Sequence, residues 1–142
     1  MIPEFDPDGY LPVGLHLASE TNVLARFGLE TKQRSRLALR LQRWLLLSRC
    51  VGAKRFFVDG SFVTSKTNPA DVDAVVWLPD DFDRRVRRGD VEAVELEAML
   101  VSRQPEEIFS AEDRRDWDAW IEFFSRTREA NDRRKGLVEI VL

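Results

Sequence analysis

Apolar residues recur along the chain at two spacings, one typical of helices and one typical of strands. A helix that Thr31 caps and that runs to about Val51 is predicted by apolar residues at helical spacing. These residues are Leu37, Leu41, Trp44 and Leu45. The same spacing and capping predict further helices, which are expected over residues 20–27 (with Ser19 as the cap), 90–102 and 111–128 (with Ser110 as the cap).

Three shorter apolar runs predict β-strands, which are expected at about residues 54–59, 71–78 and 136–142. Residues 1–18 are rich in proline and glycine and predict an extended N-terminal arm with turns. Helices and strands in this order predict an α+β fold, in which helices cover a small mixed β-sheet. With 142 residues, the chain is expected to form a single domain, residues 1–142.

The composition is that of a globular protein, with 44% hydrophobic and 33% charged residues. The net charge of −3 gives no overall attraction to nucleic acid. Because Cys50 is the one cysteine, no disulfide framework or zinc cluster is expected, and a reducing cytoplasm is the natural setting. The N-terminus lacks the pattern of a signal peptide, and the apolar runs are too short to span a bilayer, so no membrane partner is expected.

Two acidic residues, Asp71 and Asp73, stand at the start of the apolar run that predicts the second strand. Side chains two residues apart in a strand point to the same face, so these carboxylates should project together. Asp73 lies within the apolar run and would be costly to bury without a partner. A hard divalent cation with oxygen ligands resolves the repulsion, and Mg²⁺ with a phosphate substrate fits best.

A third acid, Glu139, interrupts the apolar run of the closing strand between Val138 and Ile140. One buried acid can form a structural ion pair with one of the many arginines. Three acids on two short strands are harder to explain in this way, so Glu139 is a candidate third ligand of the metal.

A Gly60-Ser61 turn ends the first predicted strand, and nine residues separate it from Asp71. Gly60 allows a close backbone approach, and a short helix that begins at Ser61 could present free N–H groups to phosphate oxygens. An ordinary strand-ending turn is the alternative. The segment from Gly60 to Lys66-Thr67 nearly matches a P-loop, but Ser65 replaces its second glycine and Pro69 prevents the helix that must follow.

The other polar features have ordinary explanations. His16 is the one histidine, and a surface or packing role is expected for it, which leaves no Ser-His-Asp set. The densest basic cluster, Arg84 to Arg88, is expected to be a solvated face. Binding of nucleic acid through this cluster is the alternative.

The chain resembles the nucleotidyltransferase superfamily, which has the DNA polymerase beta-like fold. The resemblance rests on Asp59-Gly60-Ser61, Asp71-Val72-Asp73 and Glu139, which match the hydrophobic-Gly-[Gly/Ser] turn, the Asp-x-[Asp/Glu] strand and the later acid of that superfamily. Asp59 departs from the pattern, because that position is hydrophobic in the superfamily.

Most of the chain is also similar to a small, uncharacterised bacterial family within the superfamily. That likeness rests on the opening segment from Phe5 to His16, on the Asp-Gly-Ser-Phe-Val-Thr segment that begins at Asp59, and on the closing Phe123-Phe124 and Lys135-Gly136-Leu137-Val138.

The resemblance implies a minimal nucleotidyltransferase core that moves a nucleoside monophosphate from a nucleoside triphosphate (NTP) to a hydroxyl of a protein, an RNA or a small molecule. It implies that Asp71 and Asp73 hold two Mg²⁺ (or Mn²⁺) ions and that Glu139 completes the second metal site and helps to deprotonate the acceptor. Gly60 and Ser61 would cradle the β- and γ-phosphates, and Lys66 could reach them.

A second hypothesis keeps the fold but not the catalysis. The chain is short and leaves little room for an acceptor-binding domain. It could therefore be a binding or regulatory module with a partner protein, for example half of a toxin–antitoxin pair.

Overall fold

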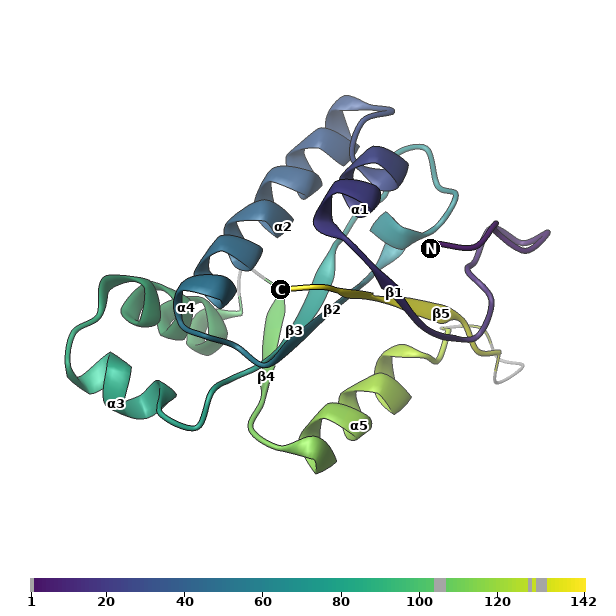
Figure 1. Cartoon of the computed structure of the whole chain (residues 1–142). Coiled ribbons are helices and arrows are strands. Elements are labelled where there is room, and N and C mark those ends of the chain that lie inside the picture. The colour runs from purple at the N-terminus through teal and green to yellow at the C-terminus, as the bar shows by residue number, and fades with distance from the viewer. Residues whose placement is uncertain (1, 104–106, 128, 130–132) are drawn as a thin grey trace.

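The structure is a computed structural model that describes residues 2–103, 107–127, 129 and 133–142. It contains a five-stranded sheet and five α-helices (Figure 1). The strands are β1 (Gly14–Ala18), β2 (Arg55–Asp59), β3 (Asp73–Trp77), β4 (Ile108–Ala111) and β5 (Gly136–Ile140). The helices are α1 (Glu20–Phe27), α2 (Lys32–Cys50), α3 (Phe82–Arg87), α4 (Val91–Ser102) and α5 (Arg114–Phe124), and a 3₁₀ helix, η1, spans Ser61–Val63.

The sheet is mixed, with the strand order β1-β5-β2-β3-β4. The central strand β2 runs antiparallel to both β3 and β5, whereas β1 pairs parallel to β5 and β4 pairs parallel to β3. The register places Asp59 of β2 directly opposite Asp73 of β3. The predicted α+β class with a small mixed sheet is confirmed.

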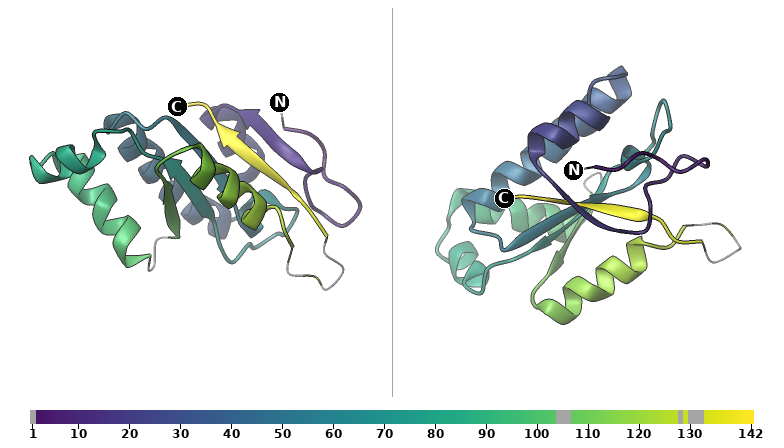
Figure 2. Two further views of the ribbon diagram at one scale, coloured as in Figure 1. Left: turned by 90° about the horizontal axis from the view of Figure 1, so that it is seen from below. Right: turned by 45° about the vertical axis from the view of Figure 1, so that its right-hand side comes forward.

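Each face of the sheet packs against its own hydrophobic cluster. The larger cluster joins one face to α1, α2, α3 and α4, and its centre includes the fully buried Trp44, Phe56 and Phe62. The smaller cluster joins the other face, here called the α5 face, to α5 through Phe57 and Trp117. Figure 2 shows α5 alone on its side of the sheet, with α1 and α2 on the opposite side. No helix in the described part of the chain is long and apolar enough to cross a membrane.

The first two helices begin where the sequence predicts. The Ser19 side chain accepts a hydrogen bond from the Asn22 N–H, and the Thr31 side chain accepts one from the Arg34 N–H. Both caps satisfy amide groups that a helix leaves unpaired in its first turn.

Two strands and one helix boundary differ from the prediction. Residues 14–18 of the predicted arm form the edge strand β1, in which Leu17 is exposed, so the usual apolar signal is weak. Residues 108–111 form β4, so α5 begins later than predicted and its cap is Asp113 instead of Ser110. Both strands lie at edges of the sheet and are short, so each gives only a short sequence signal. A short helix, α3, also forms over the basic cluster.

Arg34 fixes the loop that follows β2. Its guanidinium is buried, and it donates hydrogen bonds to the carbonyl oxygens of Phe27 (3.1 Å), Phe62 (2.7 Å) and Thr64 (2.7 Å), and also of Lys66. Burial lowers the pKa of Arg34, although a guanidinium stays charged at neutral pH. One side chain on α2 thus joins α1 to the loop between β2 and β3.

Replacing Arg34 with methionine should leave those carbonyl groups buried without donors. We expect Arg34→Met to lower the free energy of unfolding by about 2–4 kcal/mol, measured by urea denaturation. The control is Arg36→Met on the exposed side of the same helix, which should change stability by less than about 0.5 kcal/mol. Equal losses of stability in the two variants would show that the hydrogen bonds of Arg34 do not hold the loop.

Candidate functional site

One end of the α5 face carries a row of carboxylates from three adjacent strands. Asp59 at the end of β2 faces Asp73 at the start of β3. Glu107 directly precedes Ile108, which pairs with Ala74, so Glu107 comes next to Asp73. Asp59 is 2% exposed and Asp73 is 9% exposed. The pairing of β2, β3 and β4 therefore brings together three acids that are far apart in the sequence.

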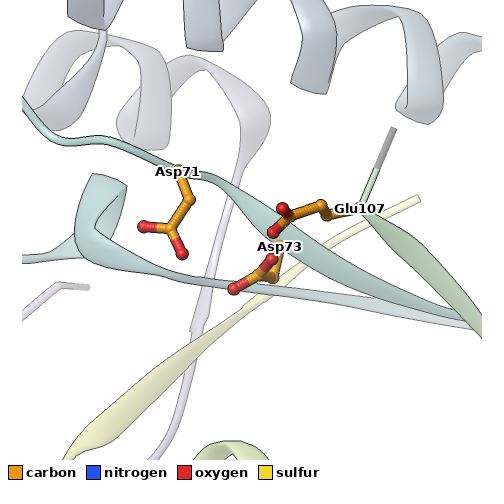
Figure 3. Close-up of side chains that lie close together, drawn as sticks. All are labelled: Asp71, Asp73 and Glu107. Carbon is orange, nitrogen blue, oxygen red and sulfur yellow. The ribbon is translucent and has the colours of Figure 1, made fainter. Parts of the chain in front are cut away.

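Asp71 joins this row from the loop before β3. Carboxylate oxygens of Asp71, Asp73 and Glu107 lie within 4.8 Å of one another, and these three residues are called the acidic cluster below. Figure 3 shows their carboxylates converging from the two sides of the start of β3. The structure thus brings Asp71 and Asp73 together, as their spacing predicts, although the regular strand begins only at Asp73.

The crowding changes the titration of the acids. Burial raises the pKa of Asp73 to about 9, and a hydrogen bond with Glu107 and the negative charges of Asp71, Glu107 and Asp59 act in the same direction. Burial also raises the pKa of Asp59, while its ion pair with Lys135 (Nζ–Oδ1, 2.8 Å) opposes the rise. In the absence of a cation, Asp73 therefore keeps its proton at neutral pH.

Gly60 allows the acids to come together. It has φ +91° and ψ 179°, a region that is essentially restricted to glycine. A Cβ atom at this position would lie 3.0 Å from the carbonyl oxygen of Asp71 and 3.1 Å from the amide nitrogen of Asp73. The end of β2 can therefore approach the backbone that carries both aspartates only because residue 60 has no side chain.

Ser61 holds the carboxylate of Asp71. Its N–H (2.9 Å) and its Oγ–H (2.6 Å) both donate to Asp71 Oδ1. The predicted short helix is present as η1, but the Phe62 N–H donates to the Asp71 carbonyl oxygen (3.0 Å). The Gly60-Ser61 turn thus positions Asp71, and its role as a phosphate cradle stays a prediction that would require Ser61 to change partners.

Glu139 and Lys66 lie outside the acidic cluster. Glu139 is on the α5 face opposite Phe57, and Arg55 donates two hydrogen bonds to its carboxylate, from Nε (2.7 Å) and Nη2 (2.6 Å). An ion pair with an arginine, the alternative left open by the sequence, therefore describes Glu139. The third acid of the cluster is Glu107 instead. The side chain of Lys66 is exposed, and its carbonyl oxygen accepts a hydrogen bond from Arg34.

The basic cluster on α3 is balanced by acids. Arg84 and Arg85 form ion pairs with Asp81, and Arg88 forms one with Asp90. These pairs are those expected of a solvated face, and they leave little net positive charge for nucleic acid.

Three members of the site are not predicted from the sequence: Glu107, Asp59 and Lys135. Glu107 precedes the short run Ile108–Ala111, and reading that run as a strand would have placed an acid at its start. Asp59 departs from the superfamily motif, but an acid that ends the apolar run of β2 is itself a signal. The contact between Lys135 and Asp59 joins residues 76 positions apart, and no local pattern predicts it.

The donor set fits a hard divalent cation. Three carboxylates offer the oxygen ligands that Mg²⁺, Mn²⁺ and Ca²⁺ prefer, and no histidine or thiol is among them. A cation between these oxygens would also remove the repulsion that raises the pKa of Asp73. Asp71, Asp73 and Glu107 are therefore the residues that would hold such an ion.

One protein-family model matches this chain, over residues 3–141, and it is described as a family of unknown function (DUF6932). The match includes the acidic cluster, the Gly60-Ser61 turn and Lys135. No curated protein and no solved structure matches the chain.

Replacing Asp73 with a side chain that does not titrate should stabilise the metal-free protein at neutral and alkaline pH. The folded state retains a proton on Asp73 up to about pH 9, whereas the unfolded state releases it near pH 3.8. Stability should therefore fall as the pH rises from about 4 to 9. Asp73→Asn removes this loss, and we expect it to raise the free energy of unfolding by about 1–3 kcal/mol at pH 8 and by less at pH 5.

Urea denaturation in EDTA at pH 5, 7 and 8.5 measures this difference. The control is Asp83→Asn on an exposed position of α3, which should have no pH-dependent effect of this size. A destabilised Asp73→Asn protein at every pH would show that the cluster is not under electrostatic strain.

A side chain at residue 60 should disturb the cluster. We expect Gly60→Ala to lower the free energy of unfolding by about 2–4 kcal/mol, because it adds backbone strain and pushes against Asp71 and Asp73. Gly89→Ala is the control, since Gly89 also has a positive φ (+83°) but its Cβ would meet no atom within 4 Å. That variant should lose only about 1 kcal/mol in the same urea titration, and an equal loss at both sites would rule out the close approach.

Proposed function

The chain belongs to the family of unknown function (DUF6932), and we propose that it is a minimal Mg²⁺-dependent nucleotidyltransferase. It would move a nucleoside monophosphate from an NTP to a hydroxyl acceptor on a protein, an RNA or a small molecule. One observation supports this most strongly. Three carboxylates converge at the end of a mixed sheet, directly beside a Gly-Ser turn.

In this proposal each residue of the site has its own role. Asp71, Asp73 and Glu107 bind Mg²⁺ or Mn²⁺, which when bound neutralises charge on the phosphates and polarises them for attack. Ser61 orients Asp71, and Gly60 keeps the backbone of the turn close to both aspartates. Glu107 is half-buried at the outer end of the row, where it can accept the proton of the acceptor hydroxyl. In this proposal Glu107 replaces Glu139, whose charge is balanced by Arg55.

The setting of the reaction follows from its reactants. NTPs and Mg²⁺ occur together in the cytoplasm, and a chain with the one cysteine Cys50 needs no oxidising compartment. We therefore place the protein there, with an NTP and a hydroxyl-bearing acceptor as its partners.

One observation favours a second candidate, a non-catalytic module of the same fold such as half of a toxin–antitoxin pair. The N–H and Oγ–H groups of Ser61 that could bind phosphate are hydrogen-bonded to Asp71. The turn therefore has fewer donors for a nucleotide than the motif predicts. In such a module the acidic cluster would face a partner protein.

Transfer of a labelled nucleotide tests the proposal. The purified protein is incubated with Mg²⁺, each of the four NTPs labelled at the α-phosphate, and a cell extract that supplies acceptors. We expect label to be transferred, and we expect Asp71→Asn/Asp73→Asn to reduce the transfer at least about 100-fold, because the metal ligands are lost. A parallel reaction with label at the γ-phosphate should transfer none, which distinguishes nucleotidyl from phosphoryl transfer.

The matched control is Asp80→Asn/Asp83→Asn, which changes one acid in the loop after β3 and one on α3 and should retain full activity. Transfer that persists in the Asp71→Asn/Asp73→Asn protein would contradict the mechanism. A melting temperature that no NTP raises in the presence of Mg²⁺ would favour the non-catalytic module.

A further inference from the structure

We infer that Lys135 is a phosphate-binding residue of this site, which contacts the polyphosphate of the substrate, and that Asp59 is its positioning residue. The inference rests on the proposed function and adds to it the group that would bind the anionic part of the NTP. It starts from the ion pair between Lys135 and Asp59 at the end of the carboxylate row that is opposite to Glu107.

The register of the sheet fixes this position. From β4 to β2 the row runs Glu107, Asp73, Asp59, and the next position on β5 is Leu137. Lys135 stands two residues before Leu137, and its Nζ lies 2.8 Å from Asp59 Oδ1. The row therefore has a carboxylate at one end and an ammonium group at the other.

The backbone of Lys135 is held on both sides. Its N–H donates to the carbonyl oxygen of Ser125 (2.8 Å), just after α5, and the Gly136 N–H donates to the carbonyl oxygen of Leu11 (2.9 Å). Gly136 fits closely against the N-terminal segment, because a Cβ atom there would lie 2.0 Å from the carbonyl oxygen of Pro12. Lys135 is thus attached at a fixed point beside the acids, unlike Lys66, whose side chain is exposed on the loop after β2.

Charge balance gives this lysine its role. The triphosphate of an NTP brings about four negative charges to a cluster of three carboxylates, so one divalent cation cannot neutralise the assembly. An ammonium group has three N–H donors, and Asp59 Oδ1 uses one of them. The side chain of Lys135 is 13% exposed and that of Asp59 is 3% exposed, so the acid is enclosed while part of the lysine side chain remains at the surface.

A second ion pair on the same face provides the comparison. Arg55 and Glu139 join β2 to β5 as Asp59 and Lys135 do, but toward the opposite end of β2, away from the acidic cluster. If Lys135 served only to neutralise a buried acid, removing the Asp59–Lys135 pair and removing the Arg55–Glu139 pair would change triphosphate affinity equally.

The experiment therefore removes each pair together, which avoids leaving one buried charge alone. Binding of Mg²⁺ with inorganic triphosphate is measured by calorimetry, and binding of Mn²⁺ alone by electron paramagnetic resonance. We expect Asp59→Asn/Lys135→Met to bind Mn²⁺ as the unchanged protein does but to bind triphosphate about 10- to 100-fold more weakly. The control Arg55→Met/Glu139→Gln should bind both ligands normally. Equal triphosphate affinity in the two double variants would overturn the inference.

A measurement on the unchanged protein covers the case in which a variant fails to fold. Acetylation of each lysine by a reactive ester is followed by mass spectrometry. We expect Mg²⁺ with triphosphate to slow the acetylation of Lys135 at least about fivefold, an effect of direct contact that Mg²⁺ alone does not produce. Lys54, whose ion pair with Asp80 lies at the other end of the sheet, is the internal control. Unchanged acetylation of Lys135 would overturn the inference.

These outcomes separate the inference from the proposed function. If triphosphate binding depends on Lys135 but no nucleotidyl transfer is found, the proposed function is contradicted and the inference about Lys135 is supported. Transfer with normal triphosphate affinity in Asp59→Asn/Lys135→Met would contradict only the inference.

Discussion

Repulsion among carboxylates at one end of the α5 face is the constraint on which the rest of the site depends. Each acid has a different compensation. Lys135 pairs with Asp59, Ser61 holds Asp71, and Asp73 keeps its proton and forms a hydrogen bond with Glu107. None of these compensations is local in sequence, so the repulsion is tolerated only because the whole sheet is in place. The two hydrophobic clusters that cover its faces stabilise the fold that keeps the acids together.

The backbone of the loop between β2 and β3 also has to be held in place for the acids to meet. Arg34 ties this loop to α2, while Gly60 lets it approach Asp71 and Asp73 closely. Crowded acids reduce stability, and such features persist where a function requires them. Arg55 and Glu139 illustrate the ordinary case, because there an acid on the same face has a full guanidinium partner and carries no strain.

Local chemistry in the sequence predicted a large part of this architecture. The caps Ser19 and Thr31 each act through an amide three residues away, and Asp71 and Asp73 are two residues apart and lie together in the cluster, so both features could be predicted from short segments. Glu107 could not be assigned in this way, because its place depends on which strand β4 pairs with and in which register. The two edge strands are hard to predict for a related reason, since each is short and pairs with a neighbouring strand on one side only.

The central claim is that the acidic cluster binds a divalent cation beside a nucleotide. Crystals grown with Mn²⁺ and a non-hydrolysable NTP analogue test it directly, because manganese can be located by its anomalous scattering. The account predicts an anomalous peak between the carboxylates of Asp71, Asp73 and Glu107, with the triphosphate next to it. A nucleotide bound elsewhere, or no peak at the cluster at millimolar Mn²⁺, would contradict the account.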